Sequence, residues 1–155
     1  MGLKSFTGTR RRFELKGEVG GVKVIDDYGH HPTELTVTLI AAKNLAQSGR
    51  VLVVFQPHRY SRTAAFAPAF ATALQIADFT FLLEVYAASE KPISGVSSLL
   101  IAKNMTDAQV KFEPSMLTVV SEVAAMAKRG DVIITLGAGD VSSLGEPILQ
   151  ALSSR

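Results

Sequence analysis

Three continuous apolar runs constrain the fold of this chain more than any other feature of its sequence. They are Arg50–Phe55, Asp78–Val85 and Asp131–Leu136. Such runs lack the in–out alternation of half-exposed strands, and they are typical of strands that a parallel sheet buries on both faces. Segments with helical spacing lie between them, a pattern that predicts βαβ units with right-handed crossovers. The chain is therefore expected to be an α/β protein.

The intervening segments have apolar residues at intervals of three or four, as buried helix faces do. A first helix is predicted over 32–48, with Pro32 at its first position and Gly49 as its C-terminal cap. Ser61 or Thr63 is expected to cap the second. The remaining predictions are a helix over 97–104, a short strand over 109–112, a helix from Pro114 to Gly130 with Leu117, Val120 and Val123 on one face, and a helix after Gly139 that carries Val141, Leu144, Ile148 and Leu152.

An alternating segment over 13–27, interrupted by Gly20-Gly21, predicts an antiparallel hairpin, since glycine takes positive φ at little cost. At 155 residues and 47% hydrophobic content, one domain with a substantial core is expected. Together these features predict a three-layer, Rossmann-like sandwich. Its mostly parallel sheet should have about six strands, one of them an antiparallel strand from the hairpin.

Polar loops follow the predicted strands at 26–34, 56–63, 84–90 and 137–140. The carboxyl ends of parallel strands meet at one edge of a sheet, where ligands bind. Two of the three histidines, His30 and His31, lie in the first loop, and His58 lies in the second. We therefore expect a functional site at this edge.

Arg59 and Arg62 lie three residues apart and should project to one side of an incipient helix, where their guanidinium groups suit a carboxylate or phosphate. A pair of surface arginines bridged to acidic residues is the alternative. His58, beside two arginines, should favour its neutral form. One of His30 and His31 is expected to face the pocket while the other secures the turn.

Asp26 and Asp27 are neighbours in a strand, so their side chains should point in opposite directions, one toward the site. A zinc site built from the three histidines and Glu34 is disfavoured, because adjacent histidines rarely bind one ion and the usual ligand spacings are absent. We therefore expect no metal site.

Gly137-Ala138-Gly139-Asp140 resembles half of a dinucleotide fingerprint and leaves open a stand-alone nucleotide-binding module, although a structural turn is favoured. No stretch of the chain matches the ATP-binding pattern G-x-x-x-x-G-K-[ST].

Composition excludes several other classes of protein. The chain has no cysteine, so disulfide and thiolate chemistry are excluded. A formal charge of +2 is too small to indicate nucleic acid binding, although residues 4–16 are rich in basic side chains. The most apolar uncharged run, 63–77, contains Pro68 and is shorter than the roughly 20 residues of a membrane span. We expect neither nucleic acid nor a membrane as a partner.

The motifs D-D-Y-G-H-H-P-T-E at 26–34, F-Q-P-H-R-Y-S-R-T at 55–63, E-V-Y at 84–86 and G-A-G at 137–139 occur in the order found in one family. In these motifs the chain resembles the C-terminal domain of the Mur ligases, in the branch that joins L-alanine to UDP-N-acetylmuramate. The resemblance runs from about Ser5 to the end. It implies that residues 10–155 form this domain and that 1–9 are an added start and a former interdomain linker.

The resemblance further implies an ATP- and Mg²⁺-dependent ligation in cytoplasmic peptidoglycan synthesis, with the N-terminal and central ATP-binding domains absent here. Arg12 and Asp27 match positions on the nucleotide side that serve domain closure. The positions around the incoming L-alanine are matched by Tyr28, His30, His58, Arg59 and Arg62. The loop at 87–90 and Asp140 depart from the family pattern, so no role is assigned to them. Without the ATP loop, the fragment is expected to be inactive.

Overall fold

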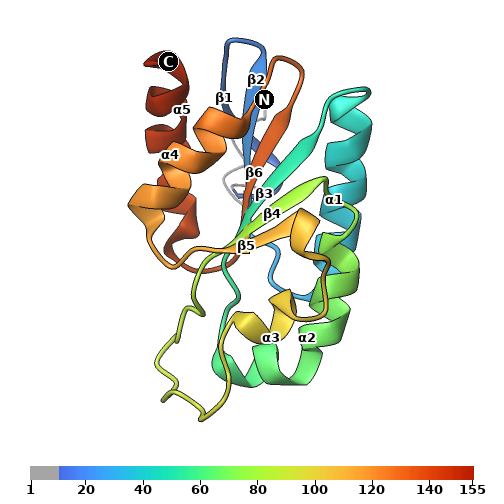
Figure 1. Cartoon of the computed structure of the whole chain (residues 1–155), viewed down its shortest axis with the longest axis vertical. Coiled ribbons are helices and arrows are strands. Elements are labelled where there is room, and N and C mark those ends of the chain that lie inside the picture. Colours follow the sequence, from blue (N-terminus) through green and yellow to red (C-terminus); the bar gives the residue numbers. More distant parts are fainter. Residues whose placement is uncertain (1–10) are drawn as a thin grey trace, which may run out of the picture.

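The computed structural model describes residues 11–155, so the linker predicted at 1–9 lies outside the described residues. These residues form a six-stranded sheet with the strand order β1-β2-β6-β3-β4-β5 (Figure 1). The elements are β1 (Glu14–Val19), β2 (Val22–Asp27), α1 (Pro32–Ala46), β3 (Val51–Phe55), α2 (Tyr60–Leu74), β4 (Phe79–Leu82), α3 (Leu99–Ala102), the 3₁₀ turn η2 (Asp107–Gln109), β5 (Val110–Phe112), α4 (Met116–Met126), β6 (Val132–Leu136), the 3₁₀ turn η3 (Asp140–Leu144) and α5 (Gly145–Ser153).

The sheet confirms the predicted fold class. β1 pairs with β2 antiparallel, and the four other pairings, from β2 through β6, β3 and β4 to β5, are parallel. The hairpin turns at Gly20 and Gly21, whose φ values are 59° and 80°. Both values lie in the left-handed region that glycine enters without a steric penalty, which is why the chain can reverse here.

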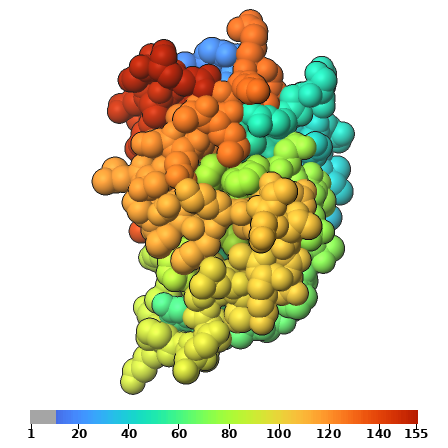
Figure 2. Space-filling view, in the orientation of Figure 1, coloured from blue at the N-terminus to red at the C-terminus, as the bar shows by residue number. Residues whose placement is uncertain are grey.

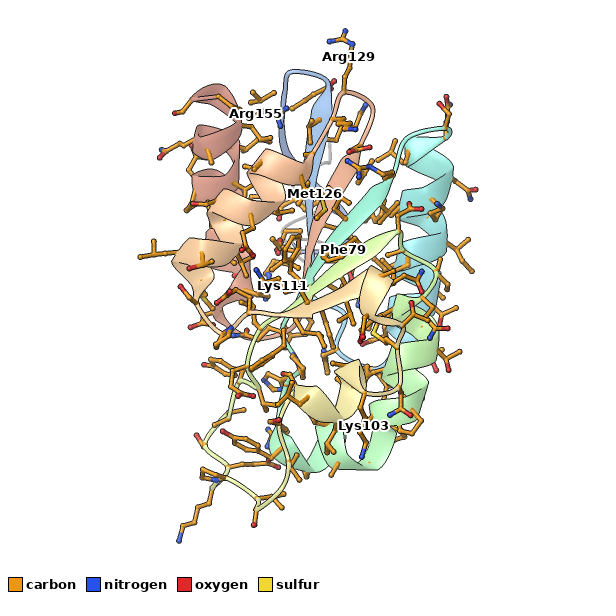
Figure 3. The ribbon with its side chains drawn as sticks, viewed as in Figure 1. Phe79, Lys103, Lys111, Met126, Arg129 and Arg155 are labelled. Carbon is orange, nitrogen blue, oxygen red and sulfur yellow. The ribbon has the colours of Figure 1, made fainter. Side chains whose placement is uncertain are left out.

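Two apolar cores lie on opposite faces of the sheet, as a three-layer sandwich requires. Alternate residues of β3 belong to different cores: Val53 faces α1 and α2, whereas Val54 faces α4 and α5. In Figure 1 the two pairs of helices lie on opposite sides of the strands. Phe79 of β4 and Met126 of α4, both labelled in Figure 3, pack against the second core. Burial on both faces explains why these strands are continuously apolar.

Several helix ends differ from the prediction. Helix α1 ends at Ala46, and its C-cap is Gln47 with a φ of 54°, so the prediction of a Gly49 cap was wrong. The residue at the N-cap of α2 is Arg59, which places Ser61 and Thr63 inside the helix. In both cases the local pattern located the helix and missed the residue that ends or begins it.

The other differences concern short elements and one helix face. Leu117 is 85% exposed, while Val119 and Val123 form the buried side of α4, so the predicted face was rotated. That helix begins after Ser115, whose side chain accepts a hydrogen bond from the Thr118 N–H, and it ends at Met126, before Gly130. The final helix is split into η3 and α5.

An ion pair fixes the end of the sheet opposite the polar loops. Asp131, just before β6, accepts hydrogen bonds from the Arg50 backbone N–H at 2.9 Å and from its Nη2 at 2.7 Å. Burial alone would raise the pKa of Asp131, but the hydrogen bonds from Arg50 and Lys128 lower it. Figure 3 shows Arg129 at the tip of the same end of the molecule. Among residues 11–155, no helix is both long and apolar enough to cross a membrane.

Candidate functional site

The loops that follow β3 and β4 are joined by backbone hydrogen bonds at the carboxyl edge of the sheet. The Arg59 N–H donates to the Tyr86 carbonyl and the Tyr86 N–H donates to the Pro57 carbonyl, each at 2.8 Å. The loop after β4 then runs outward as a projection at the lower end of the molecule (Figure 2). Lys91 and Ile93 of this loop are exposed. The sheet therefore brings together segments far apart in the sequence, as expected.

Four aromatic rings from three loops form a row along this edge. The Tyr28 and His30 centroids lie 5.1 Å apart, and those of His30 and His58 lie 5.7 Å apart. On its far side, His58 stacks on Tyr86 at 5.5 Å with an interplanar angle of 13°. Tyr28 and Tyr86 remain 48% and 37% exposed, so the row forms an open wall.

The two adjacent histidines have different environments. His31 is the N-cap of α1 and takes part in a capping box with Glu34, and its ring lies 4.9 Å from that of Phe66. The imidazole of His30 instead lies between Tyr28 and His58. The geometry therefore assigns the structural role to His31 and leaves His30 on the wall.

The two arginines predicted to act as a pair also differ. Arg62 Nη1 donates to the His58 carbonyl at 2.9 Å and contacts His58 Nδ1 at 3.1 Å. The guanidinium of Arg59 is exposed and has no hydrogen bond or ion pair with any residue in 11–155. The backbone of Arg59 has a φ of 77° and is held on both sides. Its N–H donates to the Tyr86 carbonyl, and its carbonyl accepts from the N–H and hydroxyl of Thr63. A fixed backbone thus carries a guanidinium group that is unpaired among the described residues.

The environment of His58 favours the neutral imidazole, as the sequence predicted. Desolvation lowers the pKa of His58 first, and the nearby charges of Arg62, His30 and Arg59 lower it further, against a smaller opposite effect of Glu90. Because a guanidinium nitrogen can only donate, the contact with Arg62 requires a lone pair on His58 Nδ1. The proton of neutral His58 is therefore on Nε2.

Replacing Arg62 with Ala should raise the pKa of His58 toward its ordinary value, because one of the cations that oppose protonation is removed. The measurement is an NMR titration of the imidazole C–H signals in this chain, which has three histidines. Arg50→Ala is the matched control, since Arg50 binds Asp131 at the opposite end of the sheet. An unchanged His58 titration in Arg62→Ala would contradict the assigned contact.

The two aspartates of β2 point to opposite faces, as predicted, but both are buried in structural hydrogen bonds. Asp26 accepts from Arg11 Nε and from the Thr135 hydroxyl, each at 2.7 Å. Asp27 accepts from the N–H groups of Phe13 and Gly29 and from the Thr38 hydroxyl. Asp27 thus fixes the first loop through the Gly29 N–H, next to His30, whereas Asp26 holds Arg11 beside that loop.

Arg11 is a residue of this region that the sequence analysis missed. Its Nε binds Asp26, its Nη2 donates to the Gly137 carbonyl at 2.6 Å, and its guanidinium lies 5.2 Å from the centre of the Tyr28 ring. Arg12, by contrast, is exposed and lines a pocket of about 340 Å³ together with Asp27 and Tyr28. The basic residues at the start of the chain drew attention to this region, but they did not reveal the partners of Arg11.

Glu90 is a second residue that the sequence left without a role. Its carboxylate accepts from the Ser61 N–H at 3.0 Å and from the Ser61 hydroxyl. These bonds lower the pKa of Glu90. A side chain from the loop after β4 therefore satisfies the start of α2, which has no side-chain cap of its own.

Side chains of the protein itself, those of Gln56 and Tyr86, occupy the space beside the Gly137–Asp140 turn. A Cβ at Gly139 would lie 2.5 Å from Gln56 Oε1 and 2.6 Å from the Tyr86 ring. Gln56 also donates to Asp140 and accepts from the Val141 N–H. The glycines thus permit close packing of the loops, in keeping with a structural turn.

Neither ATP nor Mg²⁺, which the resemblance implies, has a complete site among residues 11–155. The sequence lacks the ATP loop, and no cluster of three or more metal-ligating side chains occurs within 11–155. The exposed Arg12 and the adjoining pocket offer at most one wall for a nucleotide.

Comparison with known sequences identifies the family. The sequence model of the family described as "Mur ligase, glutamate ligase domain" matches residues 11–139. UDP-N-acetylmuramate–L-alanine ligase of Mycobacteroides abscessus is 51% identical over 157 residues, covering 99% of this chain and 32% of that protein. The enzyme of the same name from Mycolicibacterium smegmatis is 52% identical over 153 residues, covering 97% and 32%. The chain thus spans about a third of the length of these relatives.

Solved structures agree with this result. UDP-N-acetylmuramate–alanine ligase MurC of Thermotoga maritima superposes with a TM-score of 0.72 at 26% identity, covering 93% of this chain and 30% of that one. The murein peptide ligase of Psychrobacter arcticus superposes with a TM-score of 0.77 at 26% identity, covering 94% and 30%. The sequence match and the shared fold together show that this chain belongs to the Mur ligase family, as its C-terminal domain.

Proposed function

We propose that this chain is the amino-acid-binding and cleft-closing domain of a cytoplasmic ligase that joins L-alanine to UDP-N-acetylmuramate in peptidoglycan synthesis. In this reaction ATP, with Mg²⁺, phosphorylates the carboxylate of the nucleotide sugar. The amine of L-alanine then attacks the acyl phosphate, and the tetrahedral intermediate releases phosphate to leave an amide. The other two domains supply the ATP site and hold the sugar.

One observation carries the proposal: His30 from the loop after β2 lies beside His58 from the loop after β3, and the exposed Arg59 follows His58 in that second loop. A zwitterionic amino acid needs a cation for its carboxylate and an acceptor for its amine, and these side chains provide both. We assign Tyr28, His30, His58, Arg59 and Arg62 to the surroundings of L-alanine. Arg12 and Asp27 are assigned to the nucleotide side and to domain closure.

The packing of the Gly137–Asp140 turn argues against a stand-alone nucleotide-binding module. In a phosphate-binding loop the glycines leave space for the ligand, whereas here Gln56 and Tyr86 occupy that space. The turn also leads into a 3₁₀ segment of five residues, not directly into an α-helix whose N-terminus could bind phosphate.

The test is reconstitution. Neither this chain nor the remaining two thirds of the ligase should release ADP in response to L-alanine, because positioning by one wall cannot replace charge stabilisation at the transferring phosphoryl group. The mixture should do so when UDP-N-acetylmuramate is present. Alanine-dependent ADP release by this chain alone, or tight NAD binding in calorimetry, would refute the proposal.

A further inference from the structure

The hydrogen bonds of the two wall histidines fix different tautomers. His30 Nδ1 lies 3.1 Å from the Tyr28 carbonyl oxygen, which can only accept, so Nδ1 carries the proton of the neutral ring. His30 Nε2 therefore keeps its lone pair. In His58 the order is reversed, because Arg62 donates to Nδ1 and leaves the proton on Nε2. Two imidazoles 5.7 Å apart thus present one acceptor and one donor.

From this difference we infer that His30 accepts the proton of the incoming α-ammonium group, while His58 acts only as a hydrogen-bond donor. The inference rests on the proposed function and adds a division of roles within the same site. It also excludes the converse assignment, since His58 Nδ1 is already occupied by Arg62.

The surroundings of His30 suit a proton acceptor. Glu34 Oε1 lies 3.8 Å from His30 Nδ1 and can stabilise the imidazolium that forms. The backbone N–H groups of His30 and His31 donate to the same carboxylate. The groups that face His30 are Glu34 from α1, Tyr28 in its own loop and His58 from the loop after β3, with Arg59 and Arg62 near His58 and Arg11 over Tyr28.

The Nε2 lone pair of His30 takes one proton from the ammonium, which leaves a neutral amine and an imidazolium. The amine lone pair forms the C–N bond to the acyl phosphate carbon. The C–O bond to phosphate then breaks with its electron pair on phosphate, which takes the second nitrogen proton. The imidazolium returns its proton to solvent.

Hydroxylamine tests proton acceptance by His30 separately from the other roles of the site. It is mostly neutral near pH 7, so it attacks an acyl phosphate without first giving a proton to a base. In the full-length ligase, His30→Asn retains a donor for the Tyr28 carbonyl but lacks the basic Nε2. We expect ligation of L-alanine to slow by about 100-fold. Formation of the hydroxamate from hydroxylamine should stay close to the wild-type rate.

Three further variants sharpen the test. His30→Gln places an uncharged amide near Nε2 and should be as slow with L-alanine as His30→Asn, whereas free imidazole should restore part of the rate to His30→Ala. His31→Asn is the matched control, because asparagine is a good N-cap, and it should ligate L-alanine normally.

Three outcomes would overturn the inference: normal ligation of L-alanine by His30→Gln, a parallel loss of hydroxamate in the His30 variants, or no effect of imidazole on His30→Ala. A wild-type enzyme that forms no hydroxamate would instead refute the acyl phosphate of the proposed function, and the inference with it.

Discussion

Replacing Arg59 with Ala in the full-length ligase should raise the KM for L-alanine by about 30-fold with little change in kcat. That factor corresponds to about 2 kcal/mol, which is typical of a lost hydrogen bond to a charged group. Arg59 is singled out because its guanidinium has no other partner within residues 11–155, whereas Arg62 already binds His58. The measurement is ADP release as a function of L-alanine concentration.

The carboxylate of the substrate provides the control for this prediction. L-Alaninamide has the same amine and side chain but no carboxylate, so wild type and Arg59→Ala should use it with similar KM values. Arg59→Lys should recover only part of the affinity for L-alanine, because an ammonium cannot bind a carboxylate in the two-pronged geometry of arginine. An equal loss with both substrates would show that Arg59 acts on the fold of the loop and not on the carboxylate.

The backbone of Arg59 explains why the effect should be confined to binding. A non-glycine residue with a φ of 77° costs free energy and persists only when its surroundings fix it. Here the Tyr86 carbonyl binds the Arg59 N–H, and Thr63 binds the Arg59 carbonyl. Neither contact involves the guanidinium, so its removal leaves the loop intact.

Sequence periodicity was sufficient to predict the sheet and the edge at which its loops meet. Buried parallel strands are apolar throughout, and the ends of such strands share an edge regardless of side-chain detail. The same reasoning could not distinguish Arg59 from Arg62, or His30 from His31. Those distinctions depend on single hydrogen bonds, and the sequence gives no sign of them.

Contacts between residues far apart in the chain could not be predicted from the sequence either. Glu90 binds Ser61 from 29 positions away, and Arg11 reaches Gly137 across 126 positions. The local pattern offered Ser61 as a helix cap, and it gave Arg11 no partner within the chain. Each of these roles is set by the packing of loops from different strands, which a single sequence does not encode locally.

Gly49→Ala should destabilise the isolated chain by about 3 kcal/mol, at the upper end of the cost of overpacking. A Cβ at this position would lie 2.0 Å from the backbone oxygen of Gly130. Gly130 cannot withdraw easily, because its N–H donates to the Gly21 carbonyl and the nearby Val132 N–H donates to the Arg50 carbonyl. Glycine is therefore required by contact between two turns and not by a helix cap.

Gly145→Ala is the matched comparison for this prediction, since the chemical change is the same and the surroundings differ. Gly145 has a helical φ of −55°, and its nearest neighbour is the flexible side chain of Lys16 at 3.3 Å. Alanine favours a helix by up to about 1 kcal/mol over glycine, so this variant should match or exceed wild-type stability. Urea unfolding gives both midpoints, and similar midpoints for the two variants would show that the Gly49–Gly130 contact can relax at little cost.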